Sequence, residues 1–209
     1  MTPKALIFDI DGTLWDSRAL VAEGYNLQLR EEGLEHLCVT AEQLRPLFGQ
    51  VMTAIADVLL SSIPKSARYS LMERCMEREN RYLAENPCRI GYPGVRETLE
   101  VLHRKYDLYI VSNSQRGYPE LCMDKLGIRE LFRGHLCFGD TGTDKGKTIA
   151  LLMERYAIPS AFYIGDTQAD CLSAHEAGVG FIWASYGFGT VEGYDARITQ
   201  PRDLLSLLE

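Results

Sequence analysis

The sequence predicts an α/β protein with a doubly wound parallel sheet and an inserted helical segment. The first observation is a set of five short apolar runs, each nearly continuous rather than alternating. Continuous apolar runs are typical of parallel strands that are covered on both faces. The second is that helical patterns separate these runs along most of the chain, which predicts right-handed βαβ units in a Rossmann-like core of about five strands. The third is a long stretch after the first run that has helical periodicity and no strand.

The core elements follow one another in the order that this fold requires. Glycine and proline mark several helix boundaries: Pro93 and Gly94 precede one helix, and Gly127 and Gly178 follow two others. The strands are expected at residues 5–9, 108–112, 134–138, 161–165 and 180–184. The helices between and after them are expected at 95–105, 119–126, 147–156, 169–177 and 201–208.

Residues 16–87 interrupt this alternation with helical patterns at 17–31, 55–60 and 67–85. A segment of this length is too long for a crossover between two neighbouring strands. We therefore expect a catalytic core formed by residues 1–15 and 88–209, and a helical cap domain at 16–87 inserted after the first strand. A wide helical layer packed on one face of the sheet is the alternative.

The composition excludes several classes of function. The chain has 209 residues, of which 46% are hydrophobic, and a formal net charge of −7. The charge disfavours a nucleic-acid partner, which usually requires a basic surface. No apolar stretch is long enough to span a bilayer, and no signal peptide precedes the first strand. Six cysteines without a CxxC pair indicate reduced thiols in a cytoplasmic protein. The oligomeric state is left open.

Polar residues follow the predicted strands where ligands of open α/β sheets bind. Asp9 ends the first strand, Ser112 the second and Asp166 the fourth, while Lys145 lies in the loop after the third. Ligands of such sheets bind beyond the carboxyl ends of the strands. We therefore expect these side chains to form one site.

Asp9 and Asp11 flank the turn that follows the first strand. A carboxylate can attack phosphorus to form an aspartyl-phosphate, and a second carboxyl group can protonate the leaving oxygen and later deprotonate water. Gly12 permits the tight turn that would aim both groups at one place. The alternative is a pair of turn-forming aspartates.

Asp166 and Asp170 are candidate ligands of Mg²⁺, which prefers one or two carboxylates together with water and phosphate oxygens. They equally suit the acidic first turn of a helix, where a negative charge interacts favourably with the helix dipole. Ser112 and Asn113 are candidate phosphate donors, or a plain helix cap. Lys145 could stabilise the charge of a transferring phosphoryl group, or be solvated in its Gly-rich loop.

Arg45 lies in a helix-breaking stretch of the insertion, where it could bind a substrate anion or be solvated. The aromatic residues of 183–189, after the fifth strand, could line the mouth of the site or belong to the core. The four histidines are scattered and indicate no metal site.

The motifs resemble those of the haloacid-dehalogenase-like hydrolase superfamily, in particular its phosphoglycolate-phosphatase-like branch. The resemblance covers the core and is vague in the insertion. It rests on DxDGTL at residues 9–14, the Ser/Thr-Asn motif at 110–113, the lysine loop at 143–147, GDxxxD at 165–170 and the return segment at 92–95.

The resemblance implies a role for each core residue. It implies that Asp9 is the nucleophile, Asp11 the general acid/base and Lys145 the catalytic lysine. Many relatives have Lys-Pro where this chain has Lys145-Gly146, so Lys147 stays open as the alternative to Lys145. It also implies phosphate binding by Gly12, Thr13, Ser112 and Asn113, and Mg²⁺ binding by Asp9, Asp11, Asp166 and Asp170.

The function implied is a Mg²⁺-dependent phosphatase acting on a small phosphorylated metabolite. A phosphosugar mutase of the same superfamily keeps all these residues and is the alternative, followed by a catalytically silent phosphate-binding module. A dehalogenase would lack the second aspartate, because cleavage of a carbon–halogen bond needs no leaving-group acid, and Asp11 argues against it.

Overall fold

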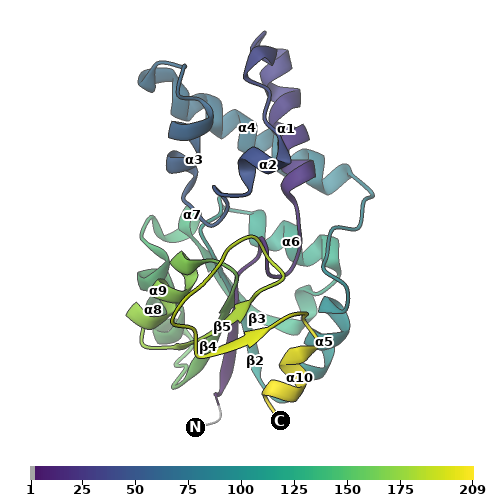
Figure 1. The fold of residues 1–209 in the computed structure, drawn as a ribbon, viewed down its shortest axis with the longest axis vertical. Coiled ribbons are helices and arrows are strands. Elements are labelled where there is room, and N and C mark those ends of the chain that lie inside the picture. Colours follow the sequence, from purple (N-terminus) through teal and green to yellow (C-terminus); the bar gives the residue numbers. More distant parts are fainter. Residues whose placement is uncertain (1–2) are drawn as a thin grey trace. The chain divides into compact units, whose positions relative to one another are not determined.

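A six-stranded parallel sheet forms the centre of the computed structural model, which describes residues 3–209 (Figure 1). The strand order is β3-β2-β1-β4-β5-β6, and every neighbouring pair is parallel. The predicted α/β fold is therefore confirmed. The strands are β1 Ala5–Phe8, β2 Asp107–Ser112, β3 Phe132–Cys137, β4 Ala161–Gly165, β5 Gly180–Ala184 and β6 Ala196–Ile198.

The centre of the sheet is set by the position of β1 between β2 and β4. Phe8, the last residue of β1, pairs with Ile110 on one side and Ile164 on the other. All four residues of β1 are buried, as expected for a central strand covered on both faces. From β1 the chain adds β2 and β3 on one side, and it then crosses to the other side of β1 to add β4. The strand order reverses at β1, and the crevice at such a point is a ligand-binding position of the fold.

The sixth strand was not predicted. β6 spans only three residues, Ala196–Ile198, of which one is buried. A segment of this length carries no detectable alternation, and its polar neighbours are typical of a loop. It extends the sheet at the edge next to β5 and lies away from the central crevice.

Helices cover both faces of the sheet. The helices α8 and α9 pack on one face, where Ile149, Leu152 and Ala174 join Ile7 and Tyr163 in one buried cluster. On the other face, α10 packs against α5. The helices of this unit are α5 Val95–Leu102, α6 Tyr118–Leu126, α7 Phe138–Thr141, α8 Lys145–Arg155, α9 Gln168–Glu176 and α10 Asp203–Leu207, with a 3₁₀ turn at Arg129–Leu131.

The chain between β1 and β2 contains a second compact unit, Ser17–Arg89, which is wholly helical. Its long helices α1 and α4 pack closely, since a Cβ on Gly24 of α1 would lie 2.8 Å from the Cα of Glu79 in α4. The unit comprises α1 Arg18–Glu31, a 3₁₀ turn at Glu35–Leu37, α2 Ala41–Leu44, α3 Met52–Leu59 and α4 Lys65–Glu85. The other unit, the α/β core, runs up to Asp16 and resumes at Ile90.

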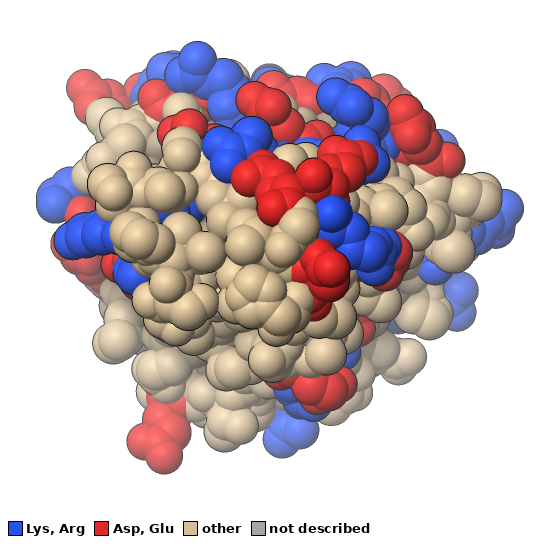
Figure 2. Space-filling view, turned by 90° about the horizontal axis from the view of Figure 1, so that it is seen from above, with Lys and Arg blue, Asp and Glu red and all other residues tan. Residues whose placement is uncertain are grey.

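Charges of both signs are interspersed on the face of the molecule drawn in Figure 2. Within the helical unit, Arg74 pairs with Glu32 at 2.5 Å and Arg68 pairs with Asp57 at 2.7 Å. Within residues 3–209, no helix combines the length and apolar character that crossing a bilayer requires. All six cysteines are free thiols.

Candidate active site

The turn after β1 brings the first two aspartates to the edge of the sheet. The carbonyl of Ile10 accepts the backbone N–H groups of Thr13, Leu14 and Trp15 in a compact loop. Gly12 has φ +81°, and a Cβ at this position would lie 2.1 Å from Oδ2 of Asp166. Glycine is therefore required here for both its backbone conformation and its lack of a side chain.

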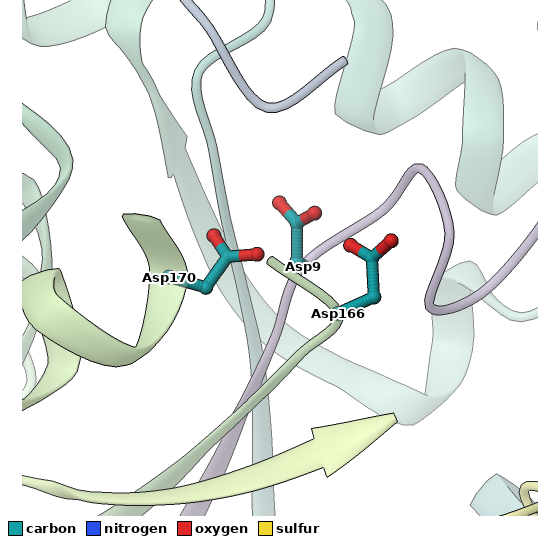
Figure 3. Close-up of side chains that lie close together, drawn as sticks. All are labelled: Asp9, Asp166 and Asp170. Carbon is teal, nitrogen blue, oxygen red and sulfur yellow. The ribbon is translucent and has the colours of Figure 1, made fainter. Parts of the chain in front are cut away.

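Three carboxylates converge beyond the strand ends: one directly after β1, one directly after β4 and one in α9 (Figure 3). Asp9, Asp166 and Asp170 each offer an oxygen atom, and these atoms all lie within 4.8 Å of one another. All three residues are buried, each with an exposed fraction of 2% or less. Such a cluster of buried negative charge requires compensation by a cation.

Lys145 supplies one such cation. Its Nζ lies 2.9 Å from Oδ1 of Asp9 and 2.5 Å from Oδ1 of Asp170. The residue was predicted in a loop, but it is the first residue of α8, whose start is capped by the side chain of Asp144. Because the helix begins here, Lys145 is buried, whereas Lys147 is exposed and pairs with Asp144.

The carboxyl groups are strongly affected by their surroundings. Burial raises the pKa of Asp9 to about 7, with the ammonium of Lys145 opposing this effect and the charge of Asp170 adding to it. Burial likewise raises the pKa of Asp166 well above its ordinary value. Burial alone would lower the pKa of Lys145, but the charges of Asp170 and Asp9 raise it above its ordinary value, so the ammonium stays protonated.

Asp166 has one oxygen atom available for a further ligand. Its Oδ2 accepts the backbone N–H of Phe188 at 2.7 Å. Its Oδ1 is buried and has no hydrogen-bond partner among the described residues. Mg²⁺ prefers hard oxygen ligands, and the positive charge of such a cation would favour the ionised form of the carboxyl groups. The donor set therefore fits a divalent cation.

Asp170 is fixed by the first turn of α9. Its Oδ2 accepts the hydroxyl of Thr167 at 2.7 Å and the backbone N–H of the same residue at 3.1 Å. In return, the Thr167 hydroxyl oxygen accepts the N–H of Asp170. Asp170 therefore closes the capping box of α9 through Oδ2 and faces the cluster through Oδ1. Its part as a metal ligand stays a prediction.

Hydroxyl groups lie in the turn after β1 and at and beyond the end of β2. Ser112 ends β2 and accepts the N–H of Ser114 at 3.2 Å. The hydroxyls of Thr13 and Ser114 are buried and have no hydrogen-bond partner in the described chain. Asn113 is half-buried beside them. Such unsatisfied donors are suited to an anionic ligand, because a buried polar group without a partner is destabilising.

Three aromatic residues that sequence reasoning did not assign to the site also reach it. Trp15 and Tyr118 both donate to Oδ1 of Asp11, at 2.7 and 2.9 Å. Tyr163 donates to the carbonyl of Val111 at 2.8 Å, and its hydroxyl lies 3.4 Å from Oδ1 of Asp9. In the sequence these residues are indistinguishable from core aromatics, so only the polar end of each side chain hints at such a role.

The remaining predicted residues differ in their placement. From the segment 183–189, Tyr186 donates its hydroxyl to the carbonyl of Thr13 at 2.9 Å, so part of this segment packs directly on the turn after β1. Arg45 belongs to the helical unit, where it is exposed at the end of α2. Its part in substrate binding stays a prediction.

The fold and the site define an α/β protein with a carboxylate–lysine centre at the carboxyl edge of a parallel sheet. The chain matches the model of the haloacid dehalogenase-like hydrolases over residues 6–184. It therefore belongs to this family, as its motifs predicted.

Curated relatives are similar over most of the chain. A phosphoglycolate phosphatase of Xanthomonas campestris is 29% identical over 192 residues, covering 89% of this chain and 85% of the relative. A phosphoglycolate phosphatase of Pseudomonas syringae is 30% identical over 198 residues, covering 89% and 71%. That of Aquifex aeolicus is 28% identical, covering 99% and 97%.

Solved structures share the fold. A haloacid dehalogenase-like family protein from Streptococcus pneumoniae has a TM-score of 0.83 at 22% identity, covering 100% of this chain and 99% of the other. A predicted phosphoglycolate phosphatase from Haemophilus somnus has a TM-score of 0.83 at 23% identity, with the same coverage.

Proposed function

We propose that this protein is a Mg²⁺-dependent phosphatase that hydrolyses a small phosphate monoester through an aspartyl-phosphate, similar to the phosphoglycolate phosphatases. The observation that carries the proposal is the placement of Asp9 at the end of a central strand, 2.9 Å from the buried ammonium of Lys145 and beside Asp166. A nucleophile, a fixed cation and hard oxygen ligands in one place are what phosphoryl transfer needs.

In the first half-reaction, a carboxylate oxygen of Asp9 attacks phosphorus, and the bond from phosphorus to the leaving-group oxygen breaks. Asp11 donates a proton to that oxygen. In the second, water attacks phosphorus, Asp11 accepts a proton from the water, and the bond between Asp9 and phosphorus breaks. The enzyme returns to its starting protonation state, and phosphate is released.

The ammonium of Lys145 would hold Asp9 in position and stabilise the negative charge that gathers around phosphorus. The hydroxyls of Ser112 and Thr13, the amide of Asn113 and the backbone at Gly12 would bind the phosphoryl oxygens. Asp9, Asp166 and the backbone carbonyl of Asp11 would hold Mg²⁺, with Asp170 supporting. Bound Mg²⁺ would supply additional charge neutralisation at the phosphoryl group.

The assay that tests this proposal is phosphate release from a panel of esters in Mg²⁺ and in excess chelator. The panel contains phosphoglycolate, a sugar phosphate, a nucleoside monophosphate, pyrophosphate and an aryl phosphate. We expect Mg²⁺-dependent release, with phosphoglycolate among the good substrates because the similar curated proteins are named for it. Conversion of a sugar phosphate to its isomer without phosphate release would favour a mutase. No turnover of any ester would contradict the proposal.

We further propose that the helical insertion, residues 16–87, is a cap that controls substrate choice. Its α2 ends at Leu44, directly before Arg45, whose guanidinium suits a carboxylate or phosphate of the substrate. Arg45→Ala is expected to change the ranking among esters more than it changes turnover of the aryl phosphate. Lys65→Ala, at an exposed lysine of the same unit, is the control. An unchanged ranking in Arg45→Ala, together with a shifted ranking in Tyr186→Phe, would place specificity in the core instead.

A further inference from the structure

The carboxylate of Asp11 is held by two aromatic side chains from separate elements of the core. The indole Nε1–H of Trp15, in the turn after β1, donates to Oδ1 of Asp11 at 2.7 Å. The hydroxyl of Tyr118, the first residue of α6, donates to the same oxygen at 2.9 Å. Both donors therefore meet on one of the two carboxylate oxygens.

The two rings are themselves fixed. Trp15 is fully buried and Tyr118 is 2% exposed. Their ring centroids lie 5.5 Å apart with an interplanar angle of 78°, an edge-to-face packing that aromatic pairs favour. The backbone of Trp15 is also anchored, since its carbonyl accepts the N–H of Gly12 at 2.9 Å. The donors are thus held in place before substrate binds.

The chemistry of the donors distinguishes the two oxygens of Asp11. An indole N–H can only donate, so Oδ1 must act as an acceptor toward Trp15. A proton on Oδ1 would compete with this donor and with the hydroxyl of Tyr118. The oxygen that can carry a transferable proton is therefore Oδ2.

We propose that Trp15 and Tyr118 are positioning residues that fix Asp11 so that its Oδ2 delivers the proton to the leaving group; this inference rests on the proposed phosphatase function. As the phosphorus–oxygen bond breaks, its electron pair goes to the leaving oxygen, which takes the proton from Oδ2. The electron pair of the O–H bond stays on Asp11, which is then the carboxylate that accepts a proton from water in the second half-reaction.

If Asp11 is not held in place, the loss of activity depends on the leaving group of the substrate. An alkoxide is strongly basic and leaves only with its proton, whereas 4-nitrophenolate is weakly basic and leaves without one. The value of kcat/KM reports the steps up to the first irreversible one, here phosphoryl transfer to Asp9. The ratio of kcat/KM for an alkyl phosphate to that for 4-nitrophenyl phosphate therefore measures how well Asp11 delivers its proton.

The test is this ratio in Tyr118→Phe, which removes the hydroxyl and keeps the ring against Trp15. We expect kcat/KM for phosphoglycolate or another alkyl phosphate to fall about tenfold or more, and that for 4-nitrophenyl phosphate to fall less than about threefold. Trp15→Phe should shift the ratio in the same direction. The double variant should lose less than the product of the single effects, since both donors act on one oxygen.

Tyr106→Phe is the matched control, because it also removes a buried tyrosine hydroxyl. That hydroxyl donates to the carbonyl of Leu208, directly after α10, at 2.7 Å, and not to Asp11. Its ratio should equal that of the wild type. A folded Tyr118→Phe with an unchanged ratio, or with equal losses toward both esters, would overturn the positioning role. Failure of the wild type to release phosphate from either ester would instead contradict the proposed function.

Discussion

The ammonium of Lys145 lies 2.9 Å from Oδ1 of Asp9, and both residues are nearly inaccessible to solvent. A lysine in the first turn of α8 thus neutralises a carboxylate at the end of β1. The same ammonium contacts Asp170 at 2.5 Å, so one positive charge is shared by two of the three clustered carboxylates. One ammonium cannot compensate three ionised carboxylates, so a divalent cation would favour their ionised form.

Removing the charge of Lys145 should destabilise the protein. Lys145→Met keeps most of the aliphatic stem but leaves Asp9 and Asp170 without their buried partner. Breaking a buried ion pair in this way costs about 3–5 kcal/mol. The free energy of unfolding, measured by urea denaturation in chelator, should fall by that order, and Mg²⁺ should restore more stability to the variant than it adds to the wild type.

The control is Lys147→Met, which removes the neighbouring exposed lysine and its pair with Asp144. A solvent-exposed pair contributes little, so its effect should stay below about 1 kcal/mol. Equal effects of the two substitutions would show that the charge of Lys145 is not needed where the structure places it.

Asp166 is predicted to anchor Mg²⁺ through its buried Oδ1. Asp166→Ala should weaken Mg²⁺ binding in calorimetric titration by at least about tenfold, because it removes a ligand that carries a charge. Chelator should abolish activity of the wild type, and added Mg²⁺ should restore it. Full turnover in excess chelator, or unaltered Mg²⁺ affinity in the variant, would be incompatible with this assignment.

Gly12→Ala should disturb the site in two ways, through its unfavourable backbone conformation and through a clash with Asp166. The added Cβ would lie 2.1 Å from Oδ2 of Asp166, and the φ of +81° is unfavourable for alanine. Gly142→Ala is a matched control, because it has φ +63° but no atom within 4 Å of the added Cβ. Both variants should lose about 1–2 kcal/mol of stability, because alanine is unfavourable at a positive φ.

Only Gly12→Ala should also lose Mg²⁺ affinity, because only its new methyl group would displace Asp166, the proposed metal ligand. Calorimetric titration of both variants measures this difference. Similar Mg²⁺ affinities in the two variants would mean that the close approach between the turn and Asp166 is not required for binding.

The stability of the carboxyl-terminal helix should depend on pH through Asp203. The backbone N–H of Thr199 donates to Oδ2 of Asp203 at 2.8 Å and holds the pKa of this carboxyl group below its ordinary value. A lowered pKa in the folded state stabilises the fold above the unfolded value of about 3.9, and this contribution is lost as the pH falls through the folded pKa.

The Tm of Asp203→Asn should therefore lie below that of the wild type at neutral pH, and the difference should shrink as the pH falls below about 4. Thermal unfolding at a series of pH values measures it. A difference that stays constant down to the lowest pH would show that ionised Asp203 contributes nothing through these hydrogen bonds.

Sequence patterns predicted the sheet because continuous apolar runs, punctuated by glycine, are a direct consequence of burial on both faces. They also predicted that Asp9 and Asp166 would meet, since both follow strands whose carboxyl ends share one edge of the sheet. The residue at which α8 begins could not be predicted, because it depends on the cap formed by Asp144. The choice between Lys145 and Lys147 depends in turn on where this helix begins.

The hydrogen bonds to Asp11 were also beyond sequence reasoning. Trp15 and Tyr118 lie 103 positions apart in the chain, and their approach is set by the packing of α6 against the turn after β1. A buried aromatic residue shows its apolar ring in the sequence pattern, whereas the direction of its single polar group is decided by tertiary packing.

Phosphate release by Asp9→Asn decides whether Asp9 is the nucleophile. The substitution removes the attacking carboxylate with little change in volume, and circular dichroism would verify that the variant is folded. Asp124→Asn, at an exposed aspartate that pairs with Arg129, is the control and should keep its activity. We predict that turnover by Asp9→Asn falls below about a thousandth of the wild-type value, as expected when a covalent nucleophile is removed. Turnover above that level by the folded variant would show that Asp9 is not the nucleophile.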